Sequence, residues 1–472
     1  MIKEMVMNTE DIETRVNGAY AKAKELQDTL NAVITFVDPS EQLKELDKYK
    51  GGKMYGVPIV LKDNVNTKGV LTTAGSKILS NYVPVYNACI ADKLREAGAI
   101  NIAKASMDEL AMGGTNLTSF TGACHNPWDI NRMAGGSSGG SAALVAAGVV
   151  PFAIGSDTGD SVRKPASFCG VVGVKPTYGR ISRYGIIPYS SSLDHVGYFT
   201  RNIEDAAIAL EVLAGRDDRD MTSSYEPVVE YSALVTGDIK GKKIAVLKNV
   251  IDAMKNEQTL NAFNKLMGQL KDKGAIVEEV SLDEDLLKAM LPTYYLIANC
   301  EATANHSNLD GMRFGFRQEG NSMEEIMINT RTAGFGSLIR KRFVIGSYGL
   351  FEENQERLFR QAQRVRRLIV NEVNKVLADY DAIVAPASGD KAPLLDDKSR
   401  DQLSDGYLIA ENHMVIGNFT GYPSMTVPMG YVDHMPVGIN ITTKAFTEVT
   451  MFDIGMAIEA CTGLKDVVAE VK

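Results

Sequence analysis

Residues 135–176 read GGSSGGSAALVAAGVVPFAIGSDTGDSVRKPASFCGVVGVKP and combine glycine, hydroxyl and apolar residues more densely than any other stretch of the chain. Two serine-bearing glycine clusters, at 135–141 and 155–161, flank an apolar segment. Within that segment, 142–150 favours a helix and 149–154 favours a short buried strand. Glycine lets the backbone approach a ligand closely or adopt a positive φ, so the two clusters predict backbone N–H groups turned toward a bound molecule. A flexible linker would lack the apolar run.

Composition indicates a large globular protein. The chain has 472 residues, of which 45% are hydrophobic and 23% charged, so it can bury an extensive core. Its formal net charge of −9 disfavours extensive direct binding to a phosphate backbone. If the protein acts on a nucleic acid, we expect another molecule to hold that nucleic acid.

The five cysteines are widely separated and form no CxxC pair. This usage predicts a cytoplasmic protein and argues against a disulfide framework or a zinc site. The N-terminal residues lack the apolar core of a signal peptide, and no run of 18 apolar residues predicts a membrane span.

Apolar strand patterns alternate with helical patterns along much of the chain, which predicts an α/β fold. The clearest strand candidates are 57–61, 99–103, 244–247, 275–280 and 381–386, and the clearest helix candidates are 88–97, 201–215, 257–274, 360–377 and 447–461. No internal repeat and no composition shift marks a linker. We therefore expect a single domain over 1–472.

Lys62 and the serines of the glycine clusters together indicate nucleophilic chemistry. A serine hydroxyl is inert at neutral pH unless a neighbouring base takes its proton. None of the five histidines lies in a recognisable triad motif. Lys62 follows the apolar strand 57–61, and a buried lysine whose pKa falls to about 7–8 can replace histidine as the base. Taken singly, such a lysine is usually a surface charge and such a serine a turn residue.

Three ordered segments resemble the amidase signature family. They are YGVPIVLKDN at 55–64, the glycine clusters at 135–161, and KPTYGRISRYG at 175–185. The resemblance covers roughly residues 15–460. It implies a single large α/β domain with a central mixed, twisted β-sheet covered by helices on both faces.

The resemblance also implies a Ser-Ser-Lys triad. Lys62 is the expected base, Ser137 the relay serine held by a cis peptide, and Ser161 the nucleophile. The proton is expected to pass from Ser161 through Ser137 to Lys62 and to return to the leaving ammonia. The backbone N–H groups of the loop Thr158, Gly159 and Asp160 are the expected oxyanion donors.

Within the family, the chain is most similar to the glutaminase subunits of tRNA-dependent amidotransferases, on stretches 107–114, 305–317 and 340–346. This similarity implies a heterotrimer with subunits B and C. The chain would hydrolyse glutamine through an acyl-enzyme and deliver ammonia to the B subunit, which amidates Glu-tRNA(Gln) or Asp-tRNA(Asn). ATP, magnesium and the main tRNA contacts belong to that partner. No metal, cofactor or membrane contact is expected for this chain, which has no Walker A sequence.

The same resemblance assigns substrate-binding residues. Arg342 is expected to pair with the α-carboxylate of glutamine, because its guanidinium binds carboxylates bidentately. A surface charge on a helix is the plain alternative. Glu411 is expected to bind the α-amino group, and Ser138 and Asp157 to complete the site.

The resemblance divides the chain into four parts. Residues 1–50 form an N-terminal helical segment, and 51–230 form the signature core with the catalytic residues. Residues 231–380 are mainly helical and complete the glutamine pocket, and 381–472 return to the core as strands and a helix.

Three other functions stay open. A free-standing amidase would act on a small amide without partners. A non-catalytic scaffold would result if Asp160 disabled the oxyanion site. Residues 135–139 also fit the G-x-S-x-G elbow of α/β-hydrolases, with Asp194 and His195 as partners. That elbow requires a preceding strand, and we expect 127–133 to be a loop and His195 to lie in a loop beside the site.

Asp160 and Lys164 depart from the family pattern, which usually has glycine and glutamine at these two positions. A carboxylate beside the oxyanion loop opposes the developing negative charge unless a cation compensates it. The two residues have opposite charges and lie one helical turn apart, so we expect them to compensate each other.

We therefore predict that Asp160→Gly and Lys164→Gln, made singly and together, give non-additive changes in the rate of amide hydrolysis. Residues that act as a unit show interaction energies of about 0.5–3 kcal/mol in such a cycle. Steady-state kinetics of the four proteins measure this energy, and plain additivity contradicts the prediction.

Overall fold

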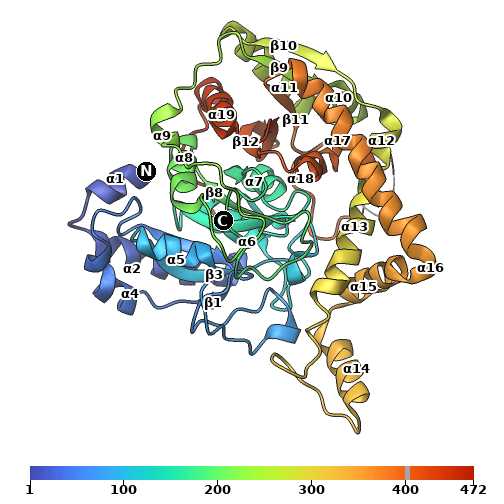
Figure 1. Cartoon of the computed structure of the whole chain (residues 1–472). Coiled ribbons are helices and arrows are strands. Elements are labelled where there is room, and N and C mark those ends of the chain that lie inside the picture. The colour runs from blue at the N-terminus through green and yellow to red at the C-terminus, as the bar shows by residue number, and fades with distance from the viewer. Residues whose placement is uncertain (399–403, 405, 472) are drawn as a thin grey trace.

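The computed structural model describes residues 1–398, 404 and 406–471. One large mixed β-sheet lies at the centre of the fold (Figure 1). Eleven strands follow the order β1-β3-β2-β6-β8-β7-β12-β13-β11-β9-β10, and β4 and β5 form a separate hairpin. The bounds are β1 Val33–Phe36, β2 Pro58–Lys62, β3 Ile100–Ala105, β4 His125–Asn126, β5 Asp129–Met133, β6 Phe152–Asp157, β7 Val172–Lys175, β8 His195–Thr200, β9 Lys243–Leu247, β10 Ile276–Val280, β11 Ala382–Pro386, β12 Ser424–Val432 and β13 Met435–Thr443.

Parallel and antiparallel pairs are grouped along the sheet. Strand β2 runs parallel to β3 and β6, and β9 runs parallel to β10 and β11. Between these groups, β8, β7, β12 and β13 pair antiparallel with their neighbours. The carboxyl ends of β2 and β6 therefore lie at the same edge, which brings Lys62 and Asp157 close together.

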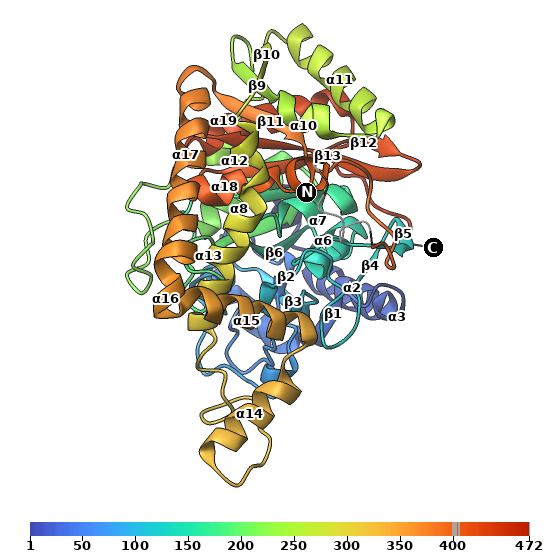
Figure 2. The same ribbon diagram turned by 90° about the vertical axis from the view of Figure 1, so that its right-hand side faces the viewer.

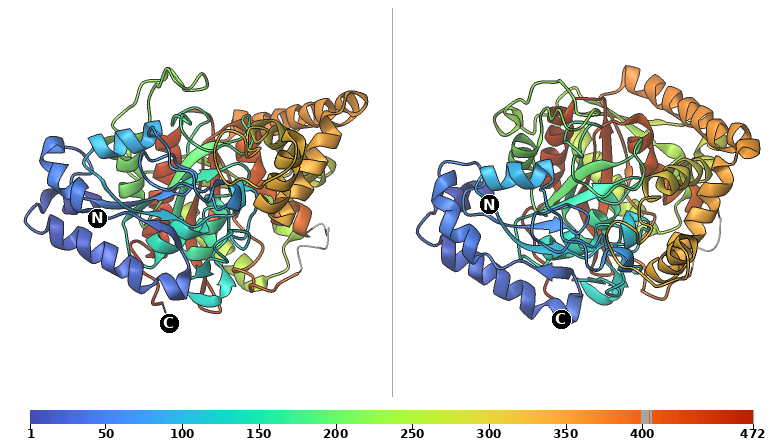
Figure 3. Two further views of the ribbon diagram at one scale, coloured as in Figure 1. Left: turned by 90° about the horizontal axis from the view of Figure 1, so that it is seen from below. Right: turned by 60° about the horizontal axis from the view of Figure 1, so that its bottom comes forward.

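Helices cover both faces of the sheet, as two views from other directions show (Figures 2 and 3). Their bounds are α1 Ile2–Met7, α2 Ile12–Glu25, α3 Gln27–Leu30, α4 Ser40–Glu45, α5 Cys89–Glu96, α6 Gly139–Ala146, α7 Arg163–Cys169, α8 Ile203–Leu213, α9 Tyr231–Leu234, α10 Lys248–Ala253, α11 Glu257–Asp272, α12 Glu284–Lys288, α13 Met290–Asn305, α14 Met323–Gly334, α15 Ser337–Leu350, α16 Glu352–Gln355, α17 Gln361–Asp379, α18 Ile416–Thr420 and α19 Glu448–Thr462.

The core follows from the period-two alternation of the strands. On β2, Ile59 and Leu61 join the cluster under α5, α8, α11 and α19, whereas Val60 faces the opposite side, with α2 and α6. The strand β11 divides in the same way: Ala382 and Val384 face the first cluster, and Ile383 faces α13 and α17. Strands buried on both faces need nearly continuous apolar sequence, which explains why they are recognisable from sequence.

The predicted fold class is confirmed, and most predicted elements agree with the structure to within a few residues. The elements that the sequence pattern missed include α1, α7, β8 and the hairpin strand β5, which runs through the predicted loop. The expectation that His195 lies in a loop is also wrong, because it begins β8. No helix in the described ranges is long and apolar enough to cross a membrane.

Helices α13 and α15 pack closely where Gly346 of α15 faces α13. An added Cβ at Gly346 would lie 2.1 Å from the backbone oxygen of Asn299 and 2.2 Å from the Thr303 hydroxyl. The contact therefore holds α15, which carries Arg342, against the body of the protein. The segment around α14, by contrast, projects away from it (Figure 1).

We predict that Gly346→Ala destabilises the protein by about 1–3 kcal/mol, the usual cost of overpacking a tight contact. Gly268→Ala is the matched control, because Gly268 also lies in a helix but has no atom within 4 Å of an added Cβ. Since alanine favours a helix over glycine, the control gains up to about 1 kcal/mol. Denaturant unfolding measures both, and equal stabilities would contradict the close-packing account.

Candidate active site

Lys62 is the last residue of β2 and is completely buried. Its Nζ lies 2.8 Å from Ser137 Oγ, 2.8 Å from Ser138 Oγ and 2.9 Å from Ser156 Oγ. Burial lowers the pKa of Lys62 to about 7, against the opposing effect of the carboxylates of Asp108, Asp157 and Asp194. A large part of the lysine population is therefore neutral near pH 7 and able to accept a proton.

Ser137 follows a cis peptide bond with Gly136, the feature expected of the relay serine. Only glycine fits at position 136, because an added Cβ would lie 2.0 Å from the Asp108 carboxylate. That carboxylate accepts the N–H groups of Thr115 and Asn116, so it ties the glycine cluster to the neighbouring loop. The sequence GGSSGG thus allows the backbone to pass closely behind the serine.

The second glycine cluster leads from β6 into α7 and carries Ser161, which is 3% exposed. The backbone N–H of Ser138 donates to the Ser161 carbonyl at 3.2 Å, which brings the two clusters together. No hydrogen bond joins the side chains of Ser161 and Ser137 within the described residues. Catalytic contacts of this kind are often long before substrate binds.

Asp157 and Arg163 hold the Ser161 loop. The guanidinium donates to both Asp157 oxygens, at 2.9 and 3.1 Å, and to the carbonyl of Gly159 at 2.8 Å. Burial alone would raise the pKa of Asp157, but the charge and hydrogen bonds of Arg163 hold it below its usual value. Asn418 also donates to this carboxylate, so α18 buttresses the loop.

The loop presents backbone donors. Among the described residues, the N–H groups of Gly159 and Ser161 have no protein acceptor. Such donors, next to a serine hydroxyl, suit the oxyanion of a tetrahedral intermediate. Gly159 also lies under the Tyr294 ring, where an added Cβ would approach within 3.0 Å.

A cavity of about 430 Å³ opens beside this loop. Gly159, Asp160 and Lys164 line it on one side, and Arg342 of α15 and Glu411 line it elsewhere. Polar groups of both charges therefore converge on a space of the size that holds a small ligand.

Arg342 is 9% exposed, and its one side-chain hydrogen bond to a described residue goes to the Tyr189 hydroxyl. The ring centroids of Tyr189 and Tyr295 lie 5.8 and 5.1 Å from its guanidinium carbon. The alternative of a helix surface charge is therefore wrong. A buried guanidinium that faces a cavity, with no paired carboxylate among the residues described, is suited to a ligand carboxylate.

Glu411 also lines the cavity, but it is held by the protein. Its carboxylate accepts from Lys164 at 2.8 Å, from the Ser388 hydroxyl at 3.0 Å and from the Gly389 N–H at 2.6 Å. The Lys164 ammonium thus contacts Glu411, and the coupling of Lys164 with Asp160 stays a prediction.

Two predicted substrate-binding residues lie away from the cavity wall. Ser138 is fully buried, accepts from Lys62 and donates to the Ser156 carbonyl at 3.1 Å. Asp157 forms a buried ion pair with Arg163. The Thr158 hydroxyl donates to Asp194, and Thr158 does not line the cavity in the described part of the chain. This side-chain bond does not engage the Thr158 backbone N–H, whose role as an oxyanion donor stays a prediction.

The α/β-hydrolase alternative fails on geometry, although the expected absence of a strand before the serine is wrong. The strand β5 does precede the serine cluster. However, Ser137 contacts Lys62, Asp194 accepts from Thr158, and His195 Nδ1 lies 2.7 Å from the Leu193 carbonyl. Ser137, Asp194 and His195 therefore form no triad.

Sequence reasoning missed the residues that support the site. Arg163 and Asn418 position the loop, and Tyr189, Tyr294 and Tyr295 surround Arg342. Arg163, two residues after Ser161, was the one with a local signal. The others reach the site only through tertiary packing. No group of three or more metal-ligating side chains occurs among the residues described.

Comparison with known proteins agrees with this geometry. The family model described as Amidase matches residues 15–452, and the chain belongs to the amidase family. It is 42% identical to the A subunit of the glutamyl-tRNA(Gln) amidotransferase of Lactobacillus acidophilus, over 93% of this chain and 91% of that protein. It is 41% identical to the corresponding protein of Exiguobacterium sibiricum, over 98% and 94% of the two chains.

Solved structures show the same fold. The A subunit of the glutamyl-tRNA(Gln) amidotransferase of Thermotoga maritima superposes with a TM-score of 0.83 at 35% identity, covering 100% of this chain and 98% of that one. The peptide amidase of Stenotrophomonas maltophilia superposes with a TM-score of 0.81 at 28% identity, covering 98% and 95%.

We predict that kcat/KM for amide hydrolysis rises with pH along an acidic limb centred near pH 7. Below the pKa of Lys62, which burial sets at about 7, the lysine is protonated and cannot accept the serine proton; above it, the base is neutral. A pH–rate profile from about pH 5.5 to about pH 9 measures the limb. Activity that stays constant down to the acid end of this range would exclude Lys62 as a base with this pKa.

Proposed function

We propose that this chain is the glutaminase subunit of a tRNA-dependent amidotransferase. The observation that carries the proposal is the buried guanidinium of Arg342 in the cavity beside the Ser161 loop. Glutamine has a carboxylate for Arg342 and a carboxamide for the serine. The similarity to proteins named as the A subunit of glutamyl-tRNA(Gln) amidotransferase supports this choice of amide.

Acylation begins when Ser161 Oγ attacks the carboxamide carbon. The Ser161 proton passes to Ser137 Oγ as the Ser137 proton passes to the neutral Lys62 Nζ. The carbonyl oxygen becomes an oxyanion held by the N–H groups of the loop at Gly159 and Ser161. Each such donor is worth about 10²–10³ in rate.

Collapse of this intermediate breaks the C–N bond. The leaving nitrogen takes a proton back along the same chain and departs as ammonia, which leaves a glutamyl ester on Ser161. Water then attacks the ester, with the neutral lysine again drawing the proton through Ser137. As the ester C–O bond breaks, Lys62 returns the proton through Ser137 to Ser161 Oγ. The products are glutamate and the free Ser161 hydroxyl.

Transfer of ammonia to an acceptor requires partners. We propose subunits B and C as partners, with the B subunit carrying ATP, magnesium and the Glu-tRNA(Gln) or Asp-tRNA(Asn). The net charge of −9 on this chain agrees with tRNA contacts made mainly by another protein of the complex. The five cysteines are free thiols, which supports a cytoplasmic location.

A free-standing amidase is the second candidate. The structural likeness to a peptide amidase favours it, because the two chains share the fold over nearly their whole length. In this function the cavity takes another amide, and the activity needs no partner.

We predict that the purified chain releases ammonia from glutamine, that the rate rises sharply with subunits B and C and charged tRNA, and that Ser161→Ala lowers it by at least about 10³-fold. Ammonia release measured with and without partners tests this. Partner-independent hydrolysis of simple amides, with glutamine ignored, would establish the second candidate instead.

Arg342→Lys sharpens the comparison. The variant keeps a positive charge but loses the bidentate geometry. It should raise KM for glutamine while leaving hydrolysis of an amide without a carboxylate unchanged. An equal effect on both substrates would contradict the role given to Arg342.

A further inference from the structure

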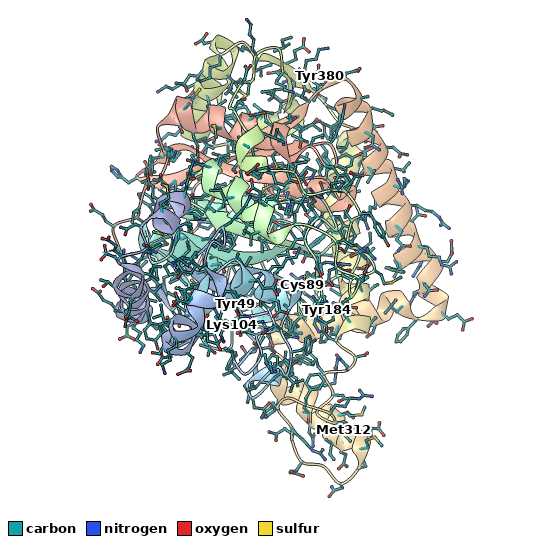
Figure 4. All side chains as sticks on the ribbon, turned by 60° about the vertical axis from the view of Figure 1, so that its left-hand side comes forward. Tyr49, Cys89, Lys104, Tyr184, Met312 and Tyr380 are labelled. Carbon is teal, nitrogen blue, oxygen red and sulfur yellow. The ribbon has the colours of Figure 1, made fainter. Side chains whose placement is uncertain are left out.

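A second cavity, of about 240 Å³, reaches Ser156, whose hydroxyl lies 2.9 Å from Lys62 Nζ. It shares no lining residue with the cavity of Arg342 among the residues described. Asn64, Ser156 and His195 line its inner part, and Tyr184 belongs to its wall (labelled in Figure 4). Asn64 and His195 are both at least nine-tenths buried. Asn64 Oδ1 and His195 Nε2 have no hydrogen-bond partner among the described residues.

Three hydroxyls surround Lys62, yet only one of them belongs to the proton relay. A neutral lysine has two N–H donors and one lone pair. To receive the Ser137 proton, the lone pair must point at Ser137. Nζ also lies 3.4 Å from the Ser156 carbonyl oxygen, the longest of its four contacts. The other two hydroxyls lie closer, so they must accept the two N–H groups and must not donate to the lysine.

The hydroxyl of Ser138 meets this requirement through its own hydrogen bond. It donates to the main-chain carbonyl of Ser156 at 3.1 Å. Its oxygen accepts the backbone N–H of Ser156 at 3.3 Å and has a second lone pair for Lys62 Nζ at 2.8 Å.

Asn64 helps the hydroxyl of Ser156 to accept an N–H of Lys62. The Asn64 amide Nδ2 donates to Ser156 Oγ at 3.0 Å, on an oxygen that also lies 2.9 Å from Lys62 Nζ. Because Ser156 lines the second cavity, its hydroxyl hydrogen can point into that space. His195, protonated at Nδ1 toward the Leu193 carbonyl, presents an acceptor at Nε2 to the same cavity. A water between the two groups would complete the chain.

We propose that Ser156 and Asn64 are positioning residues for amide hydrolysis. Asn64 orients the Ser156 hydroxyl so that its oxygen accepts an N–H of Lys62, which leaves the lysine lone pair for Ser137. The proposal rests on the role of Lys62 as the base in the proposed function. Neither residue lines the cavity of Arg342 in the described structure, so neither is placed to bind the amide.

The test is the kinetics of Ser156→Ala and Ser156→Thr, measured on glutamine in the complex with the partner subunits. Ser156→Ala removes one acceptor and should lower kcat by about 10–100-fold with KM unchanged, since misdirecting a catalytic group costs up to about 10² in rate. Ser156→Thr keeps the hydroxyl and should restore most of kcat. Asn64→Leu removes the orienting donor and should resemble Ser156→Ala.

Two controls make the outcome decisive. Met221→Ala alters the mouth of the same cavity at a side chain that is 91% exposed, and should leave kcat unchanged. Thermal melting checks that each variant is folded. Wild-type kcat in folded Ser156→Ala overturns the proposal, and so does an equal loss in Ser156→Ala and Ser156→Thr, which would indicate packing alone.

The proposed function is tested separately by Lys62→Ala and Ser161→Ala. If both lose activity while Ser156→Ala does not, the positioning role fails and the triad stands. If Lys62→Ala keeps full activity, the proposed function itself fails.

Discussion

The burial of one lysine amine among serine hydroxyls is the constraint on which the site depends. Lys62 reaches this position because β2 lies inside the sheet, with β3 and β6 on either side. In water the pKa of Lys62 would keep its amine charged at neutral pH. Burial away from solvent lowers that pKa to about 7. Ser137 must then donate its hydroxyl hydrogen to the amine, and the other hydroxyls must accept N–H groups from it. The glycine clusters let the backbone and the hydroxyls come this close.

Around this centre, the fold separates two tasks. The carboxyl ends of β2 and β6 hold the chemistry, and buried hydrogen bonds fix it there. The helices that follow β10 bring Arg342 to the same space from a distant part of the sequence. The Arg163–Asp157 pair and Asn418 tie the C-terminal segment, which contains α18, to the carboxyl end of β6. A buried ion pair of this kind costs desolvation, which its many hydrogen bonds offset.

Much of the fold was predictable because strands buried on both faces read as short apolar runs, as β2, β9 and β11 do. The elements that were not predicted have weaker patterns in the sequence. The helix α7 contains a proline and is only 7 residues long, and β8 begins at a histidine. The strand β5 has exposed and half-buried residues in a two-stranded hairpin, where no core imposes an apolar pattern.

The sequence by itself indicated the family and the α/β layering, because glycine and hydroxyl residues in ordered motifs leave a local signature. The family resemblance then proposed Lys62, Ser137 and Ser161 as the triad. Only the tertiary structure decided which polar residues face a ligand. It turned Asp157 and Ser138 inward and left the Arg342 guanidinium at a cavity wall. It also set the Ser156 hydroxyl beside the lysine and brought the Asn64 amide to that hydroxyl. Hydrogen-bond partners far apart in the chain are chosen by packing, and local sequence carries no record of that choice.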